Sequence, residues 1–278
     1  MCHVVLSQSF ARRCFSNPRT NSNSLHPSLY LIIDDHSVEL TVESHRVAED
    51  PDGNLKAPSG SILESIVERG KLQCGVVIPE GMPEDEMLSS KNQTGMNVDL
   101  CHTVAASVFY GDYSDVDIFP FYSMDEAFDS LGNGTVDLIA GTVVHKWYDM
   151  QDQDEGYHFS TPYLYTVDDE DSTTVNSIAF ATRDDDIFFS SYVNAVVMAL
   201  FYAVEEAISQ KKSNRMPLTS TFGKDFRWLM RYTISYAGNY DELYEKHFGE
   251  DSERGRNMVN EESGPQFHSY PGLAVELL

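Results

Sequence analysis

Residues 161–186 read TPYLYTVDDEDSTTVNSIAFATRDDD, and this stretch decides the fold. Its two apolar, strand-like runs are separated by four consecutive acids, Asp168–Asp171. A hairpin needs only a few residues at its tip, and neighbouring like charges repel one another. The pattern predicts two strands joined by an acidic turn, and it leaves open whether this is an ordinary turn or the place of a larger insertion.

Strands and helices alternate at short intervals before this hairpin. Three apolar runs predict strands: LQCGVVIP (72–79), SDVDIFPFY (114–122) and VDLIAGTVV (136–144). Ser-x-x-Glu capping boxes predict helices that begin at Ser61 and Ser123, and apolar residues recur at helical spacing between the first two strands. This alternation is typical of a mostly parallel sheet flanked by helices, so we expect an α/β fold.

The stretch Ile187–Val204 is long and uncharged enough to be compared with a membrane span. Acids flank both of its ends, at Asp184–Asp186 and Glu205–Glu206, and no Lys or Arg anchors it. Polar residues inside it lower its hydrophobicity further. We therefore expect a core helix buried against the sheet, and no transmembrane segment.

The charge of the chain restricts its partners. Its 278 residues include 44 acids and only 19 bases, which gives a net charge of −25. Nucleic acid needs clustered Lys and Arg, and the only basic cluster along the sequence, Lys211–Lys212, is short, so we exclude this partner. Residues 1–33 contain no acid, which is typical of an organelle transit peptide but also of an unstructured start.

The sequence contains few groups with recognisable chemistry. We find no nucleophile elbow, zinc-protease, phosphate-loop, dinucleotide or calcium-loop motif, and therefore expect no enzyme activity, no cofactor and no metal. Cys74 and Cys101 lack metal-ligand spacing, so they are either two buried thiols or one disulfide. His145, at the end of a predicted buried strand, is the best candidate among the histidines for a functional role.

Several blocks occur in an order that resembles a known family. LESIVERGKLQCGVVIPEGMP, TGMNVDLCHTVAASVFYGD, AFDSLGNGTVDLIAGT and FSTPYLY resemble the first lobe of solute-binding proteins of amino-acid ABC transporters, family 3. FATRDDDIFFSSYVNAVVMALFYAVEEAIS and GNYDELYEKHFG resemble that family's C-terminal part. The resemblance covers about residues 60–250. It also places Cys74 and Cys101 where such binders often carry cysteine, so we expect the two to lie within bridging distance.

What the resemblance implies is a lobe of the type II periplasmic-binding-protein fold. Such proteins have two lobes joined by two hinge strands, and here the hairpin at 161–186 stands in place of the second lobe. We expect the ligand-binding residues to be Gly141, Thr142, Val144, His145 and Asp149, and the resemblance implies that Gly141 and Thr142 keep backbone and hydroxyl contacts to the ligand. Asp149 stands where the family has an arginine for the substrate carboxylate, and an acid there would repel a carboxylate. The loop after the first strand also lacks the family's aromatic residue.

These observations predict a domain plan and a function. We expect a poorly ordered or targeting leader at 1–57, a solute-binding lobe at 58–250 and a polar tail at 251–278. The favoured function is non-catalytic, altered or weakened binding of a small polar solute, such as an amino acid or a related compound. The alternative is a truncated interaction protein without a ligand, which self-associates through the surface that the missing lobe exposes.

A dehydratase, which some proteins of this fold are, would need an activated acid–base pair that the sequence does not supply. The resemblance implies an extracytoplasmic location, whereas the acid-poor start would fit an organelle.

Overall fold

The computed structural model describes residues 30–34, 37–41, 60–79, 81–144, 156–167, 175–261, 264–267 and 275–276. The chain divides into two compact units, Met1–Arg46 and Val47–Leu278. In the first unit, strands β1 (Tyr30–Asp34) and β2 (Ser37–Thr41) pair antiparallel. The second unit carries the family resemblance, and the description below concerns this unit.

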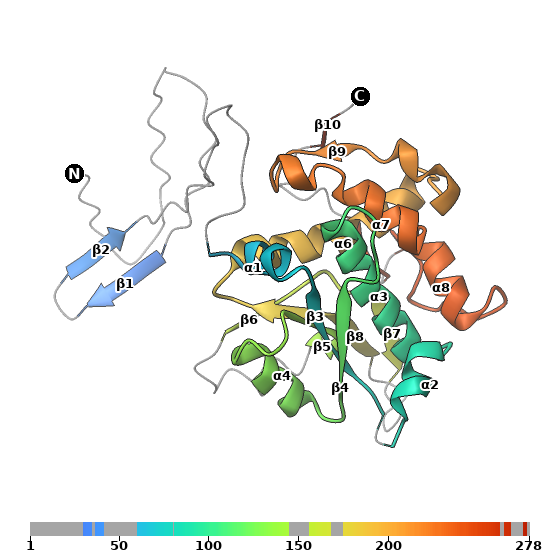
Figure 1. The fold of residues 1–278 in the computed structure, drawn as a ribbon, viewed down its shortest axis with the longest axis horizontal. Coiled ribbons are helices and arrows are strands. Elements are labelled where there is room, and N and C mark those ends of the chain that lie inside the picture. The colour runs from blue at the N-terminus through green and yellow to red at the C-terminus, as the bar shows by residue number, and fades with distance from the viewer. Residues whose placement is uncertain are drawn as a thin grey trace, which may run out of the picture. The chain divides into compact units, whose positions relative to one another are not determined.

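The second unit is built around one mixed sheet (Figure 1). Its strands are β3 (Leu72–Val77), β4 (Val116–Phe121), β5 (Leu138–Val143), β6 (Tyr157–Phe159), β7 (Leu164–Val167) and β8 (Val175–Arg183). The strand order is β4-β3-β5-β8-β6, and β7 also pairs with β8. Strands β3, β4 and β5 are parallel, whereas β8 runs antiparallel to β5, β6 and β7.

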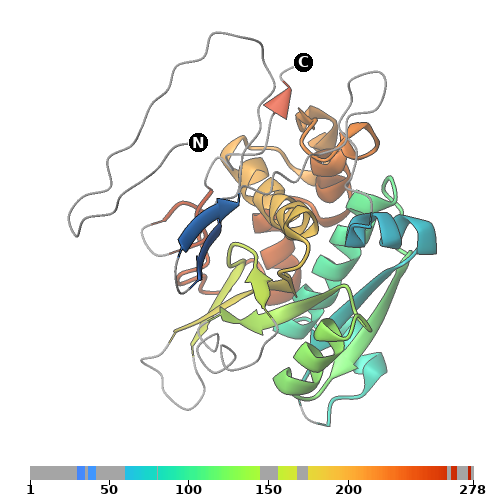
Figure 2. The same ribbon diagram turned by 90° about the vertical axis from the view of Figure 1, so that its left-hand side faces the viewer.

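Helices cover both faces of this sheet. They are α1 (Ile62–Arg69), α2 (Glu84–Ser89), α3 (Gln93–Val108), α4 (Met124–Gly132), α6 (Ile187–Glu205), α7 (Leu229–Ala237) and α8 (Tyr240–Phe248). Figure 2 shows α6 and α4 on opposite sides of the sheet. The main core lies on the side of α3 and α6, and a smaller core around Phe128 and Ile139 lies under α4. The predicted α/β fold with flanking helices is therefore confirmed.

The hairpin formed by β7 and β8 is the feature that the opening stretch predicts. Leu164 pairs with Ile178 and Val167 pairs with Val175, so only residues 168–174 separate the two strands. These linking residues lie outside the described part of the chain. Because so short a link cannot hold a domain, no second lobe is inserted between the two strands.

Helix α6 is the one described helix that is long and apolar enough to cross a membrane, and 67% of its apolar window is buried inside the fold. Its side chains Phe189, Tyr192 and Phe201 are fully buried in the main core. Asp186 caps its start by accepting a hydrogen bond from the Phe189 N–H at 2.9 Å. Such burial is typical of a core helix. A core helix is also what the acids at both ends of this stretch predict.

Two stretches differ from what their sequences predict. Residues 80–94 are mostly polar and predict a loop, but helix α2 forms there because Met87 is buried and anchors the turn. The aromatic-rich stretch Phe222–Tyr236 predicts one helix, but α7 begins only at Leu229, because Gly223 has a φ of 97° and a short 3-10 turn, η3 (Lys224–Phe226), comes first. A residue at such a positive φ ends a helix rather than starting one.

Several described residues after Glu250 contact the body of the second unit. The Asn257 side chain bonds both backbone groups of Tyr165 on β7, at 2.7 Å and 2.9 Å. Phe267 packs its ring against Tyr202 of α6, and β10 (Val275–Glu276) pairs with β9 (Leu218–Thr219). Asn257 thereby occupies backbone groups of an edge strand that would otherwise be open to pairing.

A disulfide joins β3 to α3. Cys74 and Cys101 are bonded, with their Cα atoms 6.0 Å apart, and both side chains are fully buried. The bond closes a loop with a sequence separation of 27 residues. A closed loop of this size restricts the unfolded chain and so stabilises the folded one.

We expect reduction of this bond to lower the free energy of unfolding by about 3.5 kcal/mol, the loop-closure value for such a separation. Urea denaturation of the oxidised and the reduced protein measures the difference. The double variant Cys74→Ala/Cys101→Ala is the control, because its stability must not respond to the reductant. Equal midpoints for the oxidised and reduced protein would show that the bond adds no stability.

Candidate functional site

The carboxyl ends of four strands meet at one edge of the sheet, called here the carboxyl edge. Strands β3, β4 and β5 are parallel to one another, and β7 has the same direction because both β5 and β7 run antiparallel to β8. Ligands of open α/β sheets bind outside such an edge. Tyr122 follows β4, Val144 follows β5, and Met82 lies in the loop after β3.

Tyr122 supplies the aromatic ring that the loop after β3 lacks. Its side chain is 52% exposed, and its hydroxyl lies 3.5 Å from the carbonyl oxygen of Met82. The ring therefore lies over the loop whose sequence contains no aromatic residue. Tyr122 is not among the residues predicted from the sequence. Its position is nevertheless a recognisable signal, because it is an aromatic residue directly after a strand whose carboxyl end lies at this edge.

Two helices begin at this edge. Asn92 caps α3 by accepting a hydrogen bond from Gly95 N–H at 3.2 Å, and Ser123 caps α4 by accepting one from Glu126 N–H at 3.2 Å. Asp125 and Glu126 lie exposed in the first turn of α4, beside Tyr122. The carboxyl edge thus combines one exposed ring with carboxylates, which suits a cationic or hydroxyl-rich solute better than an anion.

Gly141 and Thr142 lie on β5 with their polar groups already engaged. The Gly141 N–H donates to the Tyr163 hydroxyl at 2.7 Å, and the Thr142 hydroxyl donates to the Ala179 carbonyl at 2.6 Å. Both residues are buried. In this arrangement they hold the edge in place, and their role as ligand contacts stays a prediction.

A bulge at Gly141 turns the end of β5. The pairing register between β5 and β8 shifts between Ile139 and Thr142, and Gly141 has a φ of 89°. Bulges with a left-handed glycine commonly redirect a strand next to a binding site. Val144, the next predicted contact, is half-buried just beyond the bulge, whereas His145 and Asp149 lie outside the described residues.

A buried hydrogen-bond chain supports this bulge from below. The Tyr163 hydroxyl, which accepts from Gly141, donates to Asn97 Oδ1 of α3 at 2.9 Å. Tyr163 is fully buried, and burial raises the pKa of its hydroxyl far above the usual range, so the group keeps the proton that it donates. A Cβ atom added at Gly141 would lie 2.4 Å from the Asn97 amide nitrogen.

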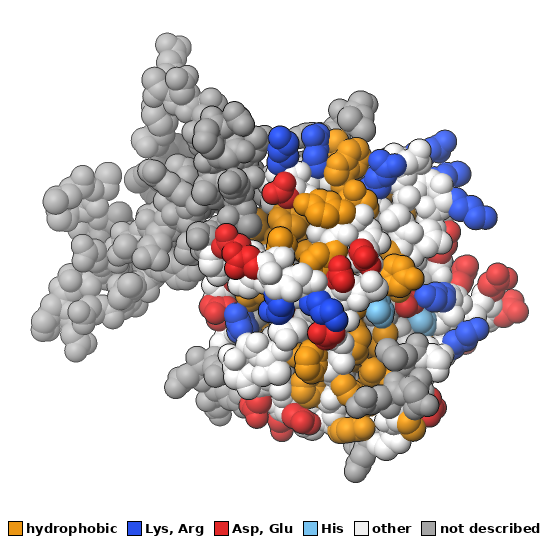
Figure 3. Space-filling model, in the orientation of Figure 1, with side chains coloured by type: hydrophobic (Ala, Val, Ile, Leu, Met, Phe, Trp, Pro, Cys, Tyr) orange, Lys and Arg blue, Asp and Glu red, His pale blue; other side chains and the backbone are white. Residues whose placement is uncertain are grey.

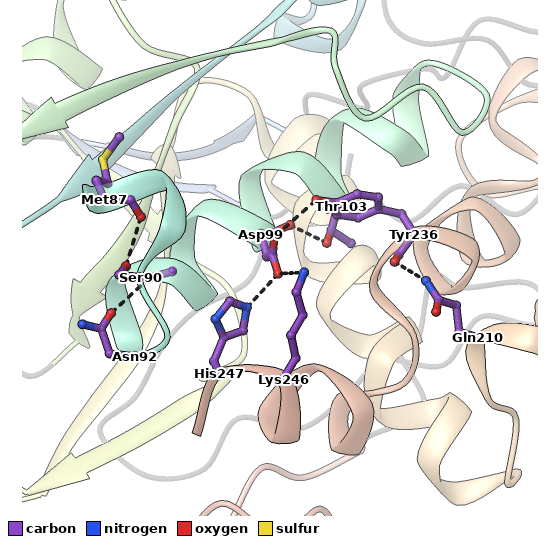
Figure 4. Close-up of polar contacts among 10 residues, drawn as sticks. Met87, Ser90, Asn92, Asp99, Thr103, Gln210, Tyr236, Lys246 and His247 are labelled. Atoms are coloured by element: carbon purple, nitrogen blue, oxygen red, sulfur yellow. Dashed lines mark hydrogen bonds and ion pairs between the residues drawn. The ribbon is translucent and has the colours of Figure 1, made fainter. Parts of the chain in front are cut away.

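A second polar cluster, drawn in Figure 4, joins three helices. Asp99 of α3 accepts hydrogen bonds from Lys246 Nζ, from His247 Nε2 at 2.7 Å and from the Tyr236 hydroxyl at 3.2 Å. Burial alone would raise the pKa of Asp99, but the hydrogen bonds from His247 and Lys246 outweigh it and hold the pKa below its usual value.

The Asp99 cluster is a tie between helices rather than a catalytic site. His247 is 6% exposed, and its Nδ1 atom is buried without a hydrogen-bond partner among the described residues, so no hydroxyl or thiol is placed for this imidazole to activate. In the described part of the chain, no group of three or more His, Cys, Asp and Glu side chains is placed to hold a metal ion.

Comparison with known proteins supports the family resemblance. No family model matches the chain. Over 130 residues it is 32% identical to the putative amino-acid ABC transporter-binding protein YhdW of Escherichia coli strain K12. These 130 residues are 46% of this chain, and the match covers 33% of that protein. The chain resembles the solute-binding proteins of amino-acid ABC transporters. The matching protein of Escherichia coli O157:H7 gives the same identity and coverage. The match therefore spans about a third of the length of these curated relatives.

One solved structure shares the fold. It is the ABC transporter/periplasmic binding protein from Brucella ovis with glutathione bound, at a TM-score of 0.51 and 17% identity. The match covers 74% of this chain and 97% of that one. At this identity the likeness concerns the fold alone, and it agrees with the α/β lobe predicted from the sequence.

We expect Gly141→Ala to lower the free energy of unfolding by about 3 kcal/mol or more. Two effects add up in this variant. Alanine is disfavoured at the positive φ of this position, and its Cβ would displace the buried Asn97 amide. Gly70→Ala is the matched control, because Gly70 has a φ of 72° but open space around it, and it should cost about 1 kcal/mol. Urea denaturation of both variants measures the difference, and equal losses would contradict the role of Asn97.

Asp99→Asn should cost about 2–3 kcal/mol at neutral pH, because Lys246 and His247 lose the largely buried carboxylate that accepts their hydrogen bonds. Since the folded pKa of Asp99 lies below the unfolded value of about 3.9, its contribution is complete above that pH and is lost as the pH falls. The variant and the wild type should therefore converge in acid, as urea denaturation at pH 7 and pH 3 would show. Asp117→Asn, which breaks an exposed pair with Lys71, should change little.

Proposed function

We propose that this chain is a non-catalytic solute-binding module that holds a small polar solute at the carboxyl edge with weak affinity. The observation that carries the proposal is the β7–β8 hairpin with its short link. By the family resemblance, this hairpin would stand in place of the second lobe. The relatives are named as binding proteins, and they support binding rather than catalysis.

Weak affinity follows from binding on one side only. A clamshell protein encloses its ligand between two lobes and removes it from water, which strengthens the polar contacts. At an edge that remains open to solvent, each hydrogen bond to the solute replaces one to water, and the net gain is small. Tyr122 can add the stacking contact that does not depend on enclosure.

The charges of the edge set the class of solute. Asp125 and Glu126 lie beside Tyr122, and by sequence Asp149 replaces the arginine that pairs with a substrate carboxylate in the family. An exposed ring with neighbouring carboxylates attracts ammonium groups and accepts hydrogen bonds from hydroxyls. The solute in this proposal is therefore a small cation, such as a polyamine, or a polyhydroxyl compound.

A second candidate function is an interaction protein that binds no small molecule. Its support is the exposure of apolar side chains at the same edge, where Val167 at the end of β7 is 58% exposed and Tyr122 is 52% exposed. A surface of this kind favours contact with another protein, including a second copy of this chain.

A thermal-shift screen over amino acids, polyamines and sugars tests the binding proposal. A solute present at ten times its Kd should stabilise the protein by about 1.4 kcal/mol and raise the midpoint by about 3–5 °C. In Tyr122→Ala the shift should fall to less than half, while the midpoint without solute stays within about 1 °C because the side chain is exposed.

Val67→Ala is the matched control for this screen. Val67 is 48% exposed and lies in the last turn of α1, which precedes the start of β3 at the opposite edge of the sheet, so its loss must leave the shift unchanged. If no compound raises the midpoint and light scattering shows a concentration-dependent dimer, the interaction protein replaces the binding module. If no compound raises the midpoint of a monomer, both solute binding and self-association fail.

A further inference from the structure

The exposed side of α7 carries an aromatic stripe. Residues at helical spacing share this side, and all of them are exposed or half-buried: Trp228, Arg231, Tyr232, Ser235 and Tyr236. Leu229, Met230 and Ile234, on the other side of the helix, are buried in the main core. An amphipathic helix usually exposes charged and small polar side chains, so three aromatic rings on its outer side are unusual.

The end of α3 extends this stripe. Tyr110 is 61% exposed and meets Tyr232 edge-on, with ring centroids 6.3 Å apart. Tyr113 is 51% exposed and stacks on Tyr236 at 4.7 Å. Tyr110 also has a φ of 57°, a left-handed conformation that is uncommon for a bulky residue and tends to occur at functional sites.

Cations surround the stripe. Between Lys211 and Arg231 the chain has six basic residues and one acid, although acids exceed bases by 25 in the whole chain. Figure 3 shows Lys and Arg side chains around apolar ones over the region of α7, β9 and the 3-10 helix η2 (Gln210–Arg215). The guanidinium carbons of Arg227 and Arg231 lie 6.0 Å and 5.1 Å from the Trp228 ring centroid.

These cations differ from other bases in the protein. Arg69, Lys71, Arg183, Lys246 and Arg254 each form an ion pair with a carboxylate. Within the described residues, no such pair engages Lys211, Lys212, Arg215, Lys224 or Arg231. Unpaired cations in so acidic a chain leave a local positive field available to a partner.

We propose that this surface, called here the α7 face and made of Tyr110, Lys224, Trp228, Arg231 and Tyr232, docks a short acidic segment of a partner protein. Tyr, Trp and Arg are the residues enriched at binding hot spots, and the cations require a complementary negative charge. In the bound state the segment's carboxylates lie on Lys224 and Arg231, and an apolar or aromatic side chain packs on the rings of Tyr110, Trp228 and Tyr232.

The size of the positive region favours a short segment over a membrane. Screening limits its field to about 8 Å at physiological salt, and beyond that distance the remaining surface is strongly acidic. A peptide of several residues fits within the region, whereas an anionic bilayer would also face the acidic remainder. The stripe and its extension at the end of α3 contain five aromatic rings, and four of them are tyrosines: Tyr110, Tyr113, Tyr232 and Tyr236. Tyrosine is common in protein interfaces.

Fluorescence anisotropy with a labelled ten-residue peptide that alternates glutamate and tyrosine tests this proposal. We expect saturable binding with a Kd of about 10–100 µM at 50 mM salt, weakened at least about fivefold at 500 mM salt. Lys224→Glu and Trp228→Ala should each weaken binding about tenfold. Lys224 is exposed, so its variant remains informative even if Trp228→Ala disturbs the start of α7.

Lys91→Glu is the matched control, because it makes the same charge change at an exposed lysine outside the α7 face and should leave peptide binding unchanged. A peptide with glutamine in place of glutamate should bind at least about tenfold more weakly. The proposal is overturned if the acidic peptide does not bind, if Lys91→Glu and Lys224→Glu weaken it equally, or if the protein sediments with phosphatidylserine vesicles but ignores the peptide. Because Tyr122 and the carboxyl edge take no part, failure here leaves the solute-binding proposal intact.

Discussion

The return of the chain from β7 directly into β8 is the constraint on which the rest of this structure depends. With only residues 168–174 between the two strands, the strands before the hairpin and β8 after it belong to one sheet. Strand β8 then pairs with β5 on one side and with β6 and β7 on the other, so it is a central strand rather than one of two connections between lobes. No lobe inserted between β7 and β8 faces the carboxyl edge, as a second lobe would in a clamshell.

The interior of the protein supports this edge. The Gly141–Tyr163–Asn97 chain connects β5, the segment before β7 and helix α3, so the bulge that redirects β5 is held by fully buried hydrogen bonds. The disulfide between Cys74 and Cys101 fixes α3 to β3 in the same core. Such rigid support positions the residues of the edge at little entropic cost when a solute binds.

The protein presents two surfaces of different chemistry. Carboxylates accompany the exposed Tyr122 at the carboxyl edge, whereas unpaired cations accompany the aromatic stripe of the α7 face. Charges of opposite sign select different partners, and screening keeps their fields apart beyond about 8 Å. A solute site and a docking site can therefore coexist on one small lobe without competing for the same ligand.

The sequence by itself determined the features that depend on neighbours along the chain. The caps at Ser61 and Ser123, the burial of α6 and the strands of the hairpin follow from short patterns with the period of a helix or a strand. The order of the sequence blocks resembles that of the solute-binding family. This resemblance predicted the α/β lobe and the nearness of Cys74 to Cys101.

Only the tertiary structure decided which distant side chains meet. Asp99 binds His247 across 148 residues, and the Tyr122 hydroxyl lies near the Met82 carbonyl across 40 residues. Arg227 and Arg231 both lie over the Trp228 ring. The physical reason is that periodicity reports which side of an element is buried, but not which other element packs there. That choice is made by the pairing register and by the folding of the whole chain.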